Sequence, residues 1–552
     1  MAECSTPERY LNGERDQVER EEKFDMYTED YRGHQPVDYR IIKGPPLEYL
    51  TGICPYPPSI PSMDEIQIKT CLFLIKPFRY SPNQHGKYPQ AIRNEHKYID
   101  IWDEHHVRMP CSPRNVDKNG RERWPNIVVA LSNLKKKCEQ KSANFDDLKK
   151  TIELCADRTY NVACLEYLFK EIFSDEQRLH FISVVLPSIC SLAMKVDIIC
   201  SQPPPLLRAG SNESITMSQV QAASLLACSF FCLFPCRSGS RLKKEYKYFQ
   251  DPNFNALYLR GGREKVEKIR CIVHYFERIQ VRKPTGVITF RRYSIPSQYV
   301  PKWSESNKNL IPVHFTTAKK IEDIECSLQV DFANRYIGGG VLNTGCVQEE
   351  IRFAICPEMI VSILVCEAMD DDECIFLIGC ERYSSYRGYS KTFQYDTDYQ
   401  DRSFKDNWGR KWSHVVAIDA IYFDDPLKQF DMKIIKREIL KAYTGFYSRK
   451  PTNQVAFPVV TGNWGCGAFN GDREVKAIIQ LMAASQTVRP MIYTAFGDKK
   501  LIESFAAIYD YLIGERATVR DLYRYLKKFC EASEKTTLFE FIRKTPVNVL
   551  RQ

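Results

Sequence analysis

The sequence predicts an α/β protein in which a central sheet with helices on both faces follows an N-terminal helical region. Three observations support this prediction. Helix-like segments that begin at capping signals occupy residues 144–235, and strand-like and helix-like segments alternate from about residue 239 onward. At 328–369 a strand-like segment, a run of three glycines and a helix-like segment follow one another. Such alternation places helices on both faces of a sheet.

The composition is that of a globular protein with more than one core. The 552 residues are 44% hydrophobic and 12% aromatic, and single cores stop growing near ~250–300 residues. The net charge of +9 comes from 78 basic and 69 acidic residues. This balance suits an anionic partner and is equally an ordinary solubility balance, so charge alone leaves both interpretations open.

The N-terminal sequence and the cysteines predict a protein that is not secreted. Residues 1–9 contain no apolar core, so we expect no signal peptide, and we expect the 21 cysteines to be reduced thiols. The longest apolar run, Gln221–Phe234, is shorter than the ~18 residues that suggest a membrane span. Cys228, Cys232 and Cys236 recur at every fourth position, which favours a buried helix face over a metal site.

The first 238 residues divide into two predicted parts. Residues 1–62 are charged and then proline-rich, which predicts an extended N-terminal arm, and residues 63–238 read as a mainly helical accessory domain. Near the start of that domain, Ile66–Ile75 alternates like a strand.

Capping signals predict where the helices of the accessory domain begin. Asn144 caps a helix that extends through Ala156. Ser174–Gln177 and Thr216–Gln219 both have the pattern of a capping box, with a hydroxyl first and an amide three residues later. They predict two helices of roughly 18 residues, which end near or beyond Pro187 and at Pro235.

Residues 239–552 are predicted to form an α/β domain with C-terminal helices. It begins with a charged amphipathic helix, Arg263–Val281, and a strand at Val287–Phe290. Further strands are predicted at Val313–Phe315, Leu328–Ala333, Cys374–Ile378, Val415–Ala420, Val455–Val460 and Met491–Phe496. Further helices are predicted at Ile351–Met369, Leu427–Phe446, Glu474–Ser485 and Lys499–Tyr511, and Thr518 caps a last helix that extends to Ala532.

A glycine run beside a pair of acids is the strongest functional signal. Gly338–Gly340 let the backbone approach a ligand closely. Glu349 and Glu350 follow at the start of a predicted helix, and the strand before the glycines ends near Asp331 and Asn334. Acids in the first turn of a helix are commonly just favourable charges. Beside three glycines and a strand-end carboxylate, we favour a site that holds a sugar-phosphate over acids.

A second glycine loop, Thr461–Asp472, lies between a predicted strand and a predicted helix. Its N–H groups and the following helix N-terminus suit a diphosphate. No Gly-Lys-Ser/Thr follows, and Asn470 stands where the dinucleotide fingerprint needs glycine or alanine. These absences argue against a nucleoside triphosphatase and a nicotinamide dehydrogenase. The alternative is a tight turn. Tyr389 and Phe496 are candidates to stack on a base or a ribose, with simple packing as their alternative.

The acids suit the cleavage of a glycosidic bond. That reaction needs an acid that protonates the leaving oxygen and a base that activates water, and one glutamate can do both in turn.

These residues resemble the poly(ADP-ribose) glycohydrolase family. Gly338–Glu350 is similar to the signature of that family, which is three glycines, a short spacer and Gln-Glu-Glu, and ordinary ADP-ribose-binding macrodomains lack the glutamate pair. Further similar segments are Val330–Arg335, Ile351–Phe353, Tyr386–Tyr389, Thr461–Phe469 and, in the helical region, Ser214–Gln219. The resemblance extends from about residue 65 to about residue 530. It implies a macrodomain-like three-layer α/β/α fold with a mixed sheet behind a helical accessory domain.

The resemblance also implies roles for individual residues. Glu350 would protonate the leaving ribose oxygen and then activate water, Glu349 would hydrogen-bond ribose hydroxyls, and Asp331 would support the site. The other implied residues bind substrate: Asn334 and Gln348; Gly338, Gly339 and Gly340 on the ribose-phosphate side; Ile321 and Glu322 at the adenine; Tyr389 over the ligand; Asn463, Trp464, Gly465, Cys466, Gly467 and Ala468 around the diphosphate; and Phe496 beside the reacting ribose.

The implied function is hydrolysis of ribose–ribose O-glycosidic bonds in poly(ADP-ribose). The enzyme would act mainly at chain ends, release ADP-ribose and reverse protein poly-ADP-ribosylation in the DNA damage response, in the nucleus or the cytoplasm. We expect no metal, cofactor, membrane or direct nucleic acid, and a monomer. The alternatives are a non-catalytic ADP-ribose reader and a hydrolase of mono-ADP-ribosylated protein. The glutamate pair argues against the reader, since a pocket for an anion gains nothing from extra negative charge.

Overall fold

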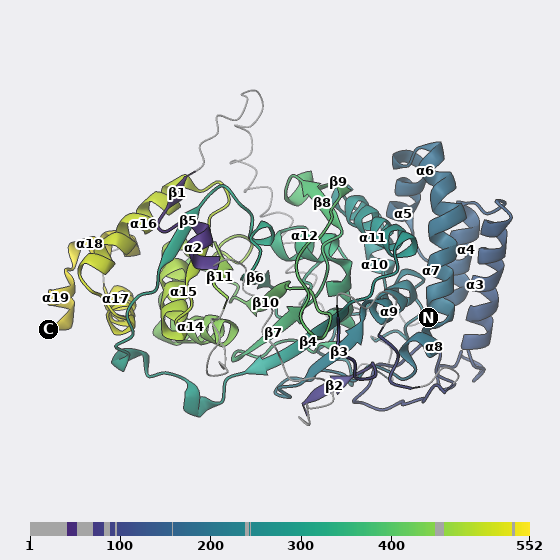
Figure 1. Ribbon diagram of the computed structural model, residues 1–552, viewed down its shortest axis with the longest axis horizontal. Coiled ribbons are helices and arrows are strands. Elements are labelled where there is room, and N and C mark those ends of the chain that lie inside the picture. The colour runs from purple at the N-terminus through teal and green to yellow at the C-terminus, as the bar shows by residue number, and fades with distance from the viewer. Residues whose placement is uncertain are drawn as a thin grey trace.

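A computed structural model describes residues 41–51, 70–81, 89–93, 97–156, 158–237, 242, 244–447, 457–532 and 536–552. Figure 1 shows an elongated molecule with a sheet in the middle, the helices α3 to α7 at one end and α16 to α19 at the other. Most of the predicted N-terminal arm lies outside the described residues. Its described part forms the short strand β1 (Ile42–Lys43) and the helix α2 (Leu47–Thr51).

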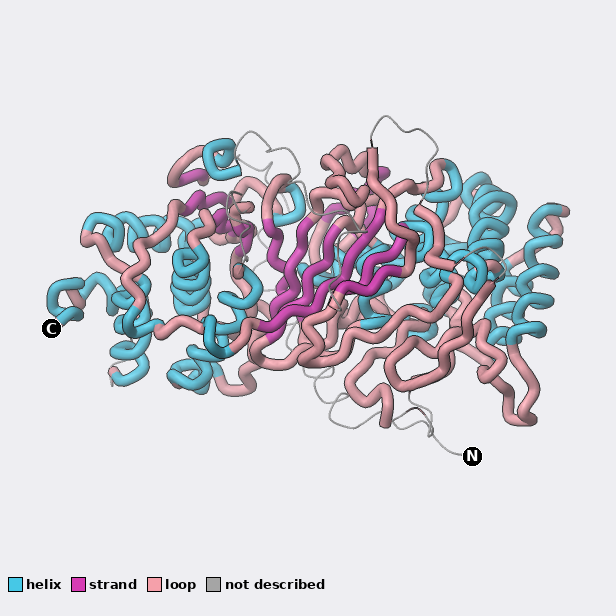
Figure 2. The backbone as a smooth tube through the Cα atoms, turned by 60° about the horizontal axis from the view of Figure 1, so that its bottom comes forward, coloured by secondary structure: helices cyan, strands magenta, loops and turns pink. Residues whose placement is uncertain are grey.

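The centre of the molecule is one mixed ten-stranded sheet, which Figure 2 shows as a twisted array. Its strands, in spatial order, are β1, β5 (Val313–Thr316), β12 (Met491–Thr494), β11 (Val459–Thr461), β6 (Leu328–Ala333), β10 (His414–Asp419), β7 (Glu373–Ile378), β4 (Val287–Ser294), β3 (Ser214–Ser218) and β2 (Cys71–Phe73). The strands from β5 to β10 are parallel to one another, so their carboxyl ends lie at one edge. Strands β10, β7, β4 and β3 pair antiparallel.

Alternate residues of the central strand β10 belong to cores on opposite faces of the sheet. Val415 and Ala417 pack in the core that contains α9 and α12. Val416 and Ile418 pack in the core that contains α14 and α15. Because successive side chains of a strand point to opposite faces, the sheet is covered on both sides. This confirms the predicted α/β/α layers.

The helices of the N-terminal half lie at the end of the molecule where the sheet ends with β3 and β2 (Figure 1). They are α3 (Trp124–Glu139), α4 (Phe145–Ala156), α5 (Ala163–Tyr167), α6 (Asp175–His180), α7 (Leu186–Met194), α8 (Val196–Cys200), α9 (Gln219–Phe230), α10 (Asn255–Tyr258) and α11 (Arg263–Val281), with π-helical turns at Leu168–Ile172 and Phe181–Val185. Asp175–Met194 runs as one helix of 20 residues with mean hydropathy 1.3, which is long and apolar enough to cross a membrane by length and composition alone. Its second part, α7, packs on α3 and α9.

The remaining helices either connect strands of the sheet or come after its last strand in sequence, β12. They are α12 (Gln348–Ile355), α13 (Val361–Val365), α14 (Met432–Phe446), α15 (Arg473–Thr487), α16 (Lys499–Gly514), α17 (Val519–Glu531), α18 (Leu538–Lys544) and α19 (Val547–Arg551). Short 3₁₀ turns occur at Ser297–Tyr299, Trp303–Glu305, Ile321–Asp323, Pro357–Ile360, Ser390–Thr392 and Pro426–Phe430. A separate hairpin consists of β8 (Ser384–Arg387) and β9 (Gln394–Asp398).

Several predicted helix boundaries are wrong. The helix predicted from Leu427 begins at Met432 after a 3₁₀ turn, and the helix predicted to end at Pro235 ends at Phe230. The capping box at Ser174 and Gln177 forms as expected. The box predicted at Thr216 is displaced, because Thr216 continues strand β3 and pairs with Thr289, and Ser218 caps α9 together with Gln221. The helix predicted at Ile351–Met369 is interrupted by Pro357, which lacks the N–H that a continuous helix requires.

Both cysteine predictions are wrong in part. Among the described cysteines 18 form no disulfide, and Cys326 is disulfide-bonded instead of reduced. The buried helix face predicted for Cys228, Cys232 and Cys236 is also wrong in part: Cys228 is buried on α9, Cys232 is buried beyond the end of α9 at Phe230, and Cys236 is half-buried.

Elements from both predicted domains share the sheet, because β2 and β3 come from the accessory part and α11 from the α/β part packs on α5 and α7. The boundaries at 62 and 238 stay predictions.

Candidate active site

The two acids of α12 converge on the glycine run that precedes them. Gly338 and Gly339 have φ angles of +88° and +50°, which favour glycine. A Cβ atom on Gly339 would lie 2.5 Å from Oε1 of Glu350 and 2.6 Å from Oε2 of Glu349. The absence of a side chain at this position therefore makes room for both carboxylates.

Backbone N–H groups of the loop hold each carboxylate. Glu349 accepts hydrogen bonds from the N–H groups of Asn334 at 2.8 Å and Gly338 at 2.7 Å. Glu350 accepts from the N–H groups of Gly340 and Val347, both at 2.9 Å. Both side chains are buried. Backbone donors of the loop therefore fix the two acids in place.

Asp331 completes the group of acids from the neighbouring strand β6. It is fully buried, and neither carboxyl oxygen has a hydrogen-bond partner in the structure. Burial and the charge of Glu350 raise the pKa of Asp331 well above its usual range, and Arg352 opposes the rise. Burial and the charges of Asp331 and Glu350 also raise the pKa of Glu349, but its two N–H donors favour the ionised form. The neutral form is therefore favoured at Asp331, which has no donor, whereas the donors of Glu349 oppose it there.

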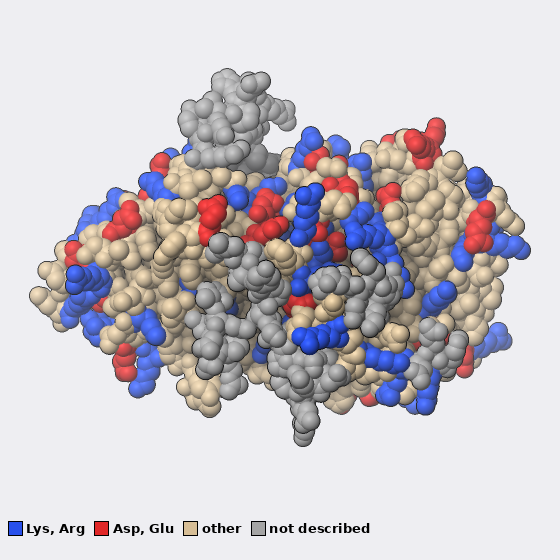
Figure 3. All heavy atoms as spheres, in the orientation of Figure 1, with Lys and Arg blue, Asp and Glu red and all other residues tan. Residues whose placement is uncertain are grey.

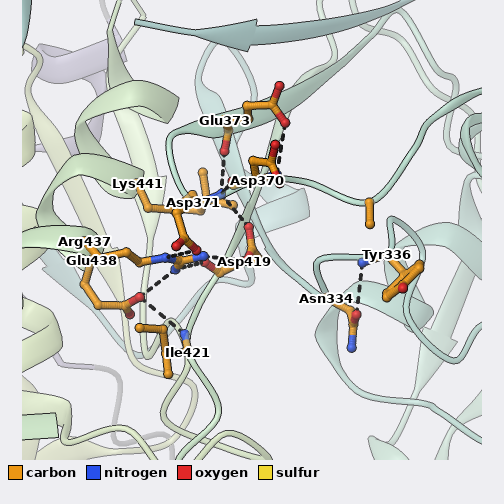
Figure 4. Close-up of polar contacts among 12 residues, drawn as sticks. Asn334, Tyr336, Asp370, Asp371, Glu373, Asp419, Ile421, Arg437, Glu438 and Lys441 are labelled. Carbon is orange, nitrogen blue, oxygen red and sulfur yellow. Dashed lines mark hydrogen bonds and ion pairs between the residues drawn. The ribbon is translucent and has the colours of Figure 1, made fainter. Parts of the chain in front are cut away.

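Asn334 and Gln348 also lie at this site, and each side chain already makes hydrogen bonds to the backbone. Gln348 accepts from the N–H of Phe332 at 2.8 Å and donates to the carbonyl of Val330 at 3.2 Å, which ties α12 to β6. Oδ1 of Asn334 accepts from the N–H of Tyr336 at 3.0 Å (Figure 4). Their predicted contacts with substrate stay predictions.

The second glycine loop follows β11 and precedes α15. Asp472 caps α15 by accepting from the N–H of Val475 at 2.9 Å. Gly467 and Ala468 are exposed, whereas Trp464 and Cys466 are buried. Trp464 donates from its indole nitrogen to the carbonyl of Ile418 at 2.8 Å. The side chains of Trp464 and Cys466 thus anchor the loop, and only the backbone of these two residues can face a ligand.

A buried network of ion pairs lies beneath this second loop. Nζ of Lys476 lies 4.1 Å from the ring centroid of Trp464 and contacts the carboxylate of Glu438. In Figure 4, Arg437 bridges Glu438 and Asp419, with both N–O distances at 2.6 Å. Lys441 contacts Asp419 at 2.6 Å. We did not predict this network. The spacing of Arg437 and Lys441 on one face of a predicted helix was the available signal.

Two aromatic side chains meet at the mouth of the site. Tyr389 and Phe496 are 41% and 64% exposed, and their ring centroids lie 6.0 Å apart at an angle of 33°. Burial of the hydroxyl and the charge of Glu350 raise the pKa of Tyr389. The structure therefore brings these two predicted residues together, although they are 107 positions apart in sequence, from 389 to 496.

The predicted adenine residues lie in the 3₁₀ turn Ile321–Asp323. Ile321 packs with Ile324, Val460 and Ile492 on the face of the sheet that carries the acids. Glu322 accepts a hydrogen bond from the hydroxyl of Tyr386 at 2.5 Å. Glu322 also lines a pocket with Gln329, Arg352 and Arg382, which was not predicted.

A buried lysine on α11 contacts the first glycine loop from behind. Lys268 is 0% exposed and donates to the carbonyls of Gly340, Asn343 and Gly345. Sequence reasoning missed it because a lysine on a charged amphipathic helix is ordinarily solvent-exposed.

On the face of the molecule that Figure 3 shows, basic side chains gather near α11 and the β8–β9 hairpin. Arg263, Arg270 and Arg387 have side chains that are 59%, 29% and 78% exposed, and they pair with Glu267 or Asp396. Within the described residues, no group of three or more His, Cys, Asp or Glu side chains is arranged to hold a metal ion.

Comparisons with known proteins place this site in a family. Residues 300–503 match the family model described as "Poly (ADP-ribose) glycohydrolase (PARG), Macro domain fold", and residues 173–292 match the one described as "Poly (ADP-ribose) glycohydrolase (PARG), helical domain". The chain is 32% identical over 458 residues to a probable poly(ADP-ribose) glycohydrolase 2 of Arabidopsis thaliana, covering 71% of this chain and 86% of that protein. It is 35% identical over 367 residues to poly(ADP-ribose) glycohydrolase 1 of Caenorhabditis elegans, covering 63% of this chain and 44% of that protein.

Proposed function

The chain belongs to the poly(ADP-ribose) glycohydrolase family, and we propose that it is a glycosidase that hydrolyses the ribose–ribose O-glycosidic bonds of poly(ADP-ribose) and releases ADP-ribose. The observation that carries this proposal is the buried pair Glu349 and Glu350, held by loop N–H groups beside Asp331. A pocket that only binds a diphosphate has no use for three buried acids, because they repel an anion.

Glu350 is the residue that we propose handles the proton. It would donate a proton to the ribose oxygen that leaves, and the resulting carboxylate would then take a proton from the attacking water. Its carboxylate is fixed by the N–H groups of Gly340 and Val347, so the geometry exists before substrate binds.

Glu349 and Asp331 serve the same reaction in other ways. Each oxygen of Glu349 accepts one backbone N–H, which leaves a lone pair on each oxygen for a ribose hydroxyl. Burial raises the pKa of Asp331 and so favours its neutral form, which would keep the negative charge of the group of acids low beside an anionic substrate.

The remaining parts of the site suit an ADP-ribose unit. The exposed backbone at Gly467 and Ala468, at the start of the segment that leads into α15, supports diphosphate binding there. Tyr389 and Phe496, which contact each other at the mouth, would separate to bracket the ribose.

The direct test is product analysis on labelled poly(ADP-ribose). The proposal expects monomeric ADP-ribose to accumulate while the remaining chains shorten gradually, since we propose that chain ends are the main substrate. A protein that binds the polymer and leaves it intact would be a reader instead. A protein that cleaves mono-ADP-ribosylated protein but leaves the polymer intact would support the third alternative.

We also propose that the enzyme acts in the nucleus or the cytoplasm on modified proteins during the DNA damage response, as a monomer and without direct nucleic acid contact. A reducing compartment is supported by the 18 described cysteines that form no disulfide, and the disulfide of Cys326 is the one observation against it among the described residues. Imaging of the tagged chain and size-exclusion chromatography with light scattering test these points.

A further inference from the structure

The first glycine loop is held from two opposite sides. On its inner side the N–H groups of Gly338, Gly340 and Val347 donate to Glu349 and Glu350. On its outer side the carbonyls of Gly340, Asn343 and Gly345 accept from the ammonium of Lys268, at 3.3 Å and 2.8 Å for the first two. Gly340 takes part on both sides. An ammonium has three N–H donors, so three carbonyls use all of them.

The burial of Lys268 shows that its contacts are specific. Its side chain comes from α11, which belongs to the segment that matches the helical domain, and it is 0% exposed. Burial lowers the pKa of Lys268, and the nearby Cys346 and Glu350 oppose the fall. A buried cation is costly unless it is hydrogen-bonded. Removing it would leave three carbonyls of the loop without this partner.

The loop has little room to relax around this contact. A Cβ atom on Gly345 would lie 2.7 Å from Oε1 of Glu350 and 2.8 Å from Cα of Gly340. The two arms of the loop therefore touch each other and the carboxylate. Any displacement of the carbonyl side moves the N–H groups that fix Glu350.

We propose that Lys268 is a positioning residue for the hydrolysis, which holds loop 338–347 so that Glu350 is directed at the bound ribose. This inference rests on the proposed function. It also gives a role in the reaction to the segment that matches the helical-domain model, since α11 lies in that segment and carries the lysine that holds the catalytic loop. Lys268 lies behind the loop and does not touch substrate.

The same helix offers a matched control. Lys265 is also buried, and its ammonium donates to the carbonyls of Ala256 at 2.8 Å and Leu259 at 3.2 Å. These carbonyls lie before α11 and away from the acids. Lys265→Met and Lys268→Met therefore remove the same chemical group from the same helix, and only the second change acts on the catalytic loop.

The test measures kcat and KM on poly(ADP-ribose), the affinity for ADP-ribose and thermal unfolding, all with the full chain. We expect Lys268→Met to lower kcat by about 100-fold with KM and ADP-ribose affinity within about threefold, because misplacement of a catalytic group costs rate more than binding. Lys268→Arg, which keeps a cation, should fall between this variant and the wild type. Lys265→Met should keep kcat within about twofold of the wild-type value, even if its unfolding temperature falls as far as that of Lys268→Met.

Two outcomes overturn the inference. One is a folded Lys268→Met with more than half of the wild-type kcat, and the other is an equal loss of kcat in Lys265→Met. If Lys268→Met does not fold, Lys268→Arg decides, and a wild-type kcat in that variant is contradictory. A wild type that leaves the polymer intact refutes the proposed function instead, which a separate assay of the wild type detects.

Discussion

The three acids of the site have different surroundings. Glu349 and Glu350 each have two backbone N–H donors, whereas Asp331 has none. Hydrogen bonds to a carboxylate favour its charged form, and burial without them favours the neutral form. Burial without a donor therefore favours the neutral form of Asp331, whereas the two N–H donors of Glu349 oppose the rise that burial causes in its pKa.

Because the neutral form of Asp331 is favoured, we expect the site to tolerate a neutral side chain at this position. Asp331→Asn keeps a neutral group of the same shape, so we expect kcat on the polymer to stay within about tenfold of wild type. The pKa of Asp331 is raised in the folded state, so its contribution to stability is present at low pH and is lost as pH rises through the folded pKa. The asparagine variant should gain stability over wild type as pH increases, by at most about 1.4 kcal/mol per pH unit.

Thermal unfolding from pH 5 to pH 8 measures this difference, with exposed Asp510→Asn as the control that should show no trend. A variant as inactive as one without Glu350 would mean that Asp331 works in its ionised form.

At this scale the sequence was informative where chemistry is local. The three acids, the glycines and the two aromatic residues were predicted from spacing and residue type. Lys268 was not, because only the packing of α11 against the loop turns an apparently exposed lysine into a buried one. Trp464 and Cys466 were predicted to surround the ligand, and their side chains instead point into the core.

Two glycine loops are the elements on which the site depends. Each follows a parallel strand at the same edge of the sheet and precedes a helix, α12 or α15. This arrangement was predictable from the alternation of strands and helices. The break between α12 and α13 occurs at Pro357, whereas the apolar pattern on both sides of this proline predicted one continuous helix.

Gly345→Ala tests the close contact between the arms of the first loop. The new Cβ would meet Glu350 at 2.7 Å and the backbone of Gly340 at 2.8 Å. We expect a loss of roughly 1–3 kcal/mol in unfolding free energy from overpacking, and a loss of kcat of at least about tenfold from displacement of Glu350. Urea denaturation and polymer assays measure these effects.

Gly514→Ala is the control, because nothing lies within 4 Å of its Cβ position. An unchanged kcat in Gly345→Ala would show that the loop has more freedom than these contacts indicate.

Lys476→Met tests the buried network below the second loop. It removes one partner of Glu438, whose carboxylate is buried, so we expect unfolding free energy to fall by roughly 3–5 kcal/mol. Adding Glu438→Gln should restore part of that loss. ADP-ribose affinity should fall as well, because Lys476 supports Trp464 within the loop.

The exposed pair Lys527 and Glu531 gives the comparison, since Lys527→Met should cost no more than about 0.5 kcal/mol. Equal losses for the two lysines would mean that the network contributes little.

At the scale of the whole molecule, buried polar contacts join the N-terminal helices to the part of the chain that forms most of the sheet. Glu358 is one such contact, because it accepts from Gln219 on α9 and from Tyr383, both at 2.8 Å. Burial and the charge of Glu381 raise the pKa of Glu358 to about 8. Such long-range contacts join residues that are distant in sequence, and no local pattern predicts them.

Glu358 predicts a pH dependence of global stability. Its pKa is raised in the folded state, so its contribution is complete below the unfolded pKa and is lost as pH rises to about 8. Glu358→Gln cannot ionise, so its thermal unfolding temperature should change less than that of wild type between pH 5 and pH 8. The difference in free energy should be on the order of a few kcal/mol. Parallel curves for the two proteins would contradict this assignment.

The central claim is that Glu350 carries the proton in the cleavage of poly(ADP-ribose), and the most direct measurement is kcat of Glu350→Gln on labelled polymer together with its affinity for ADP-ribose. Glutamine keeps the shape of the side chain and cannot transfer the proton, so we predict that kcat falls by at least about 1,000-fold while ADP-ribose affinity stays within about tenfold of wild type. A folded Glu350→Gln that releases ADP-ribose at the wild-type rate would contradict the account.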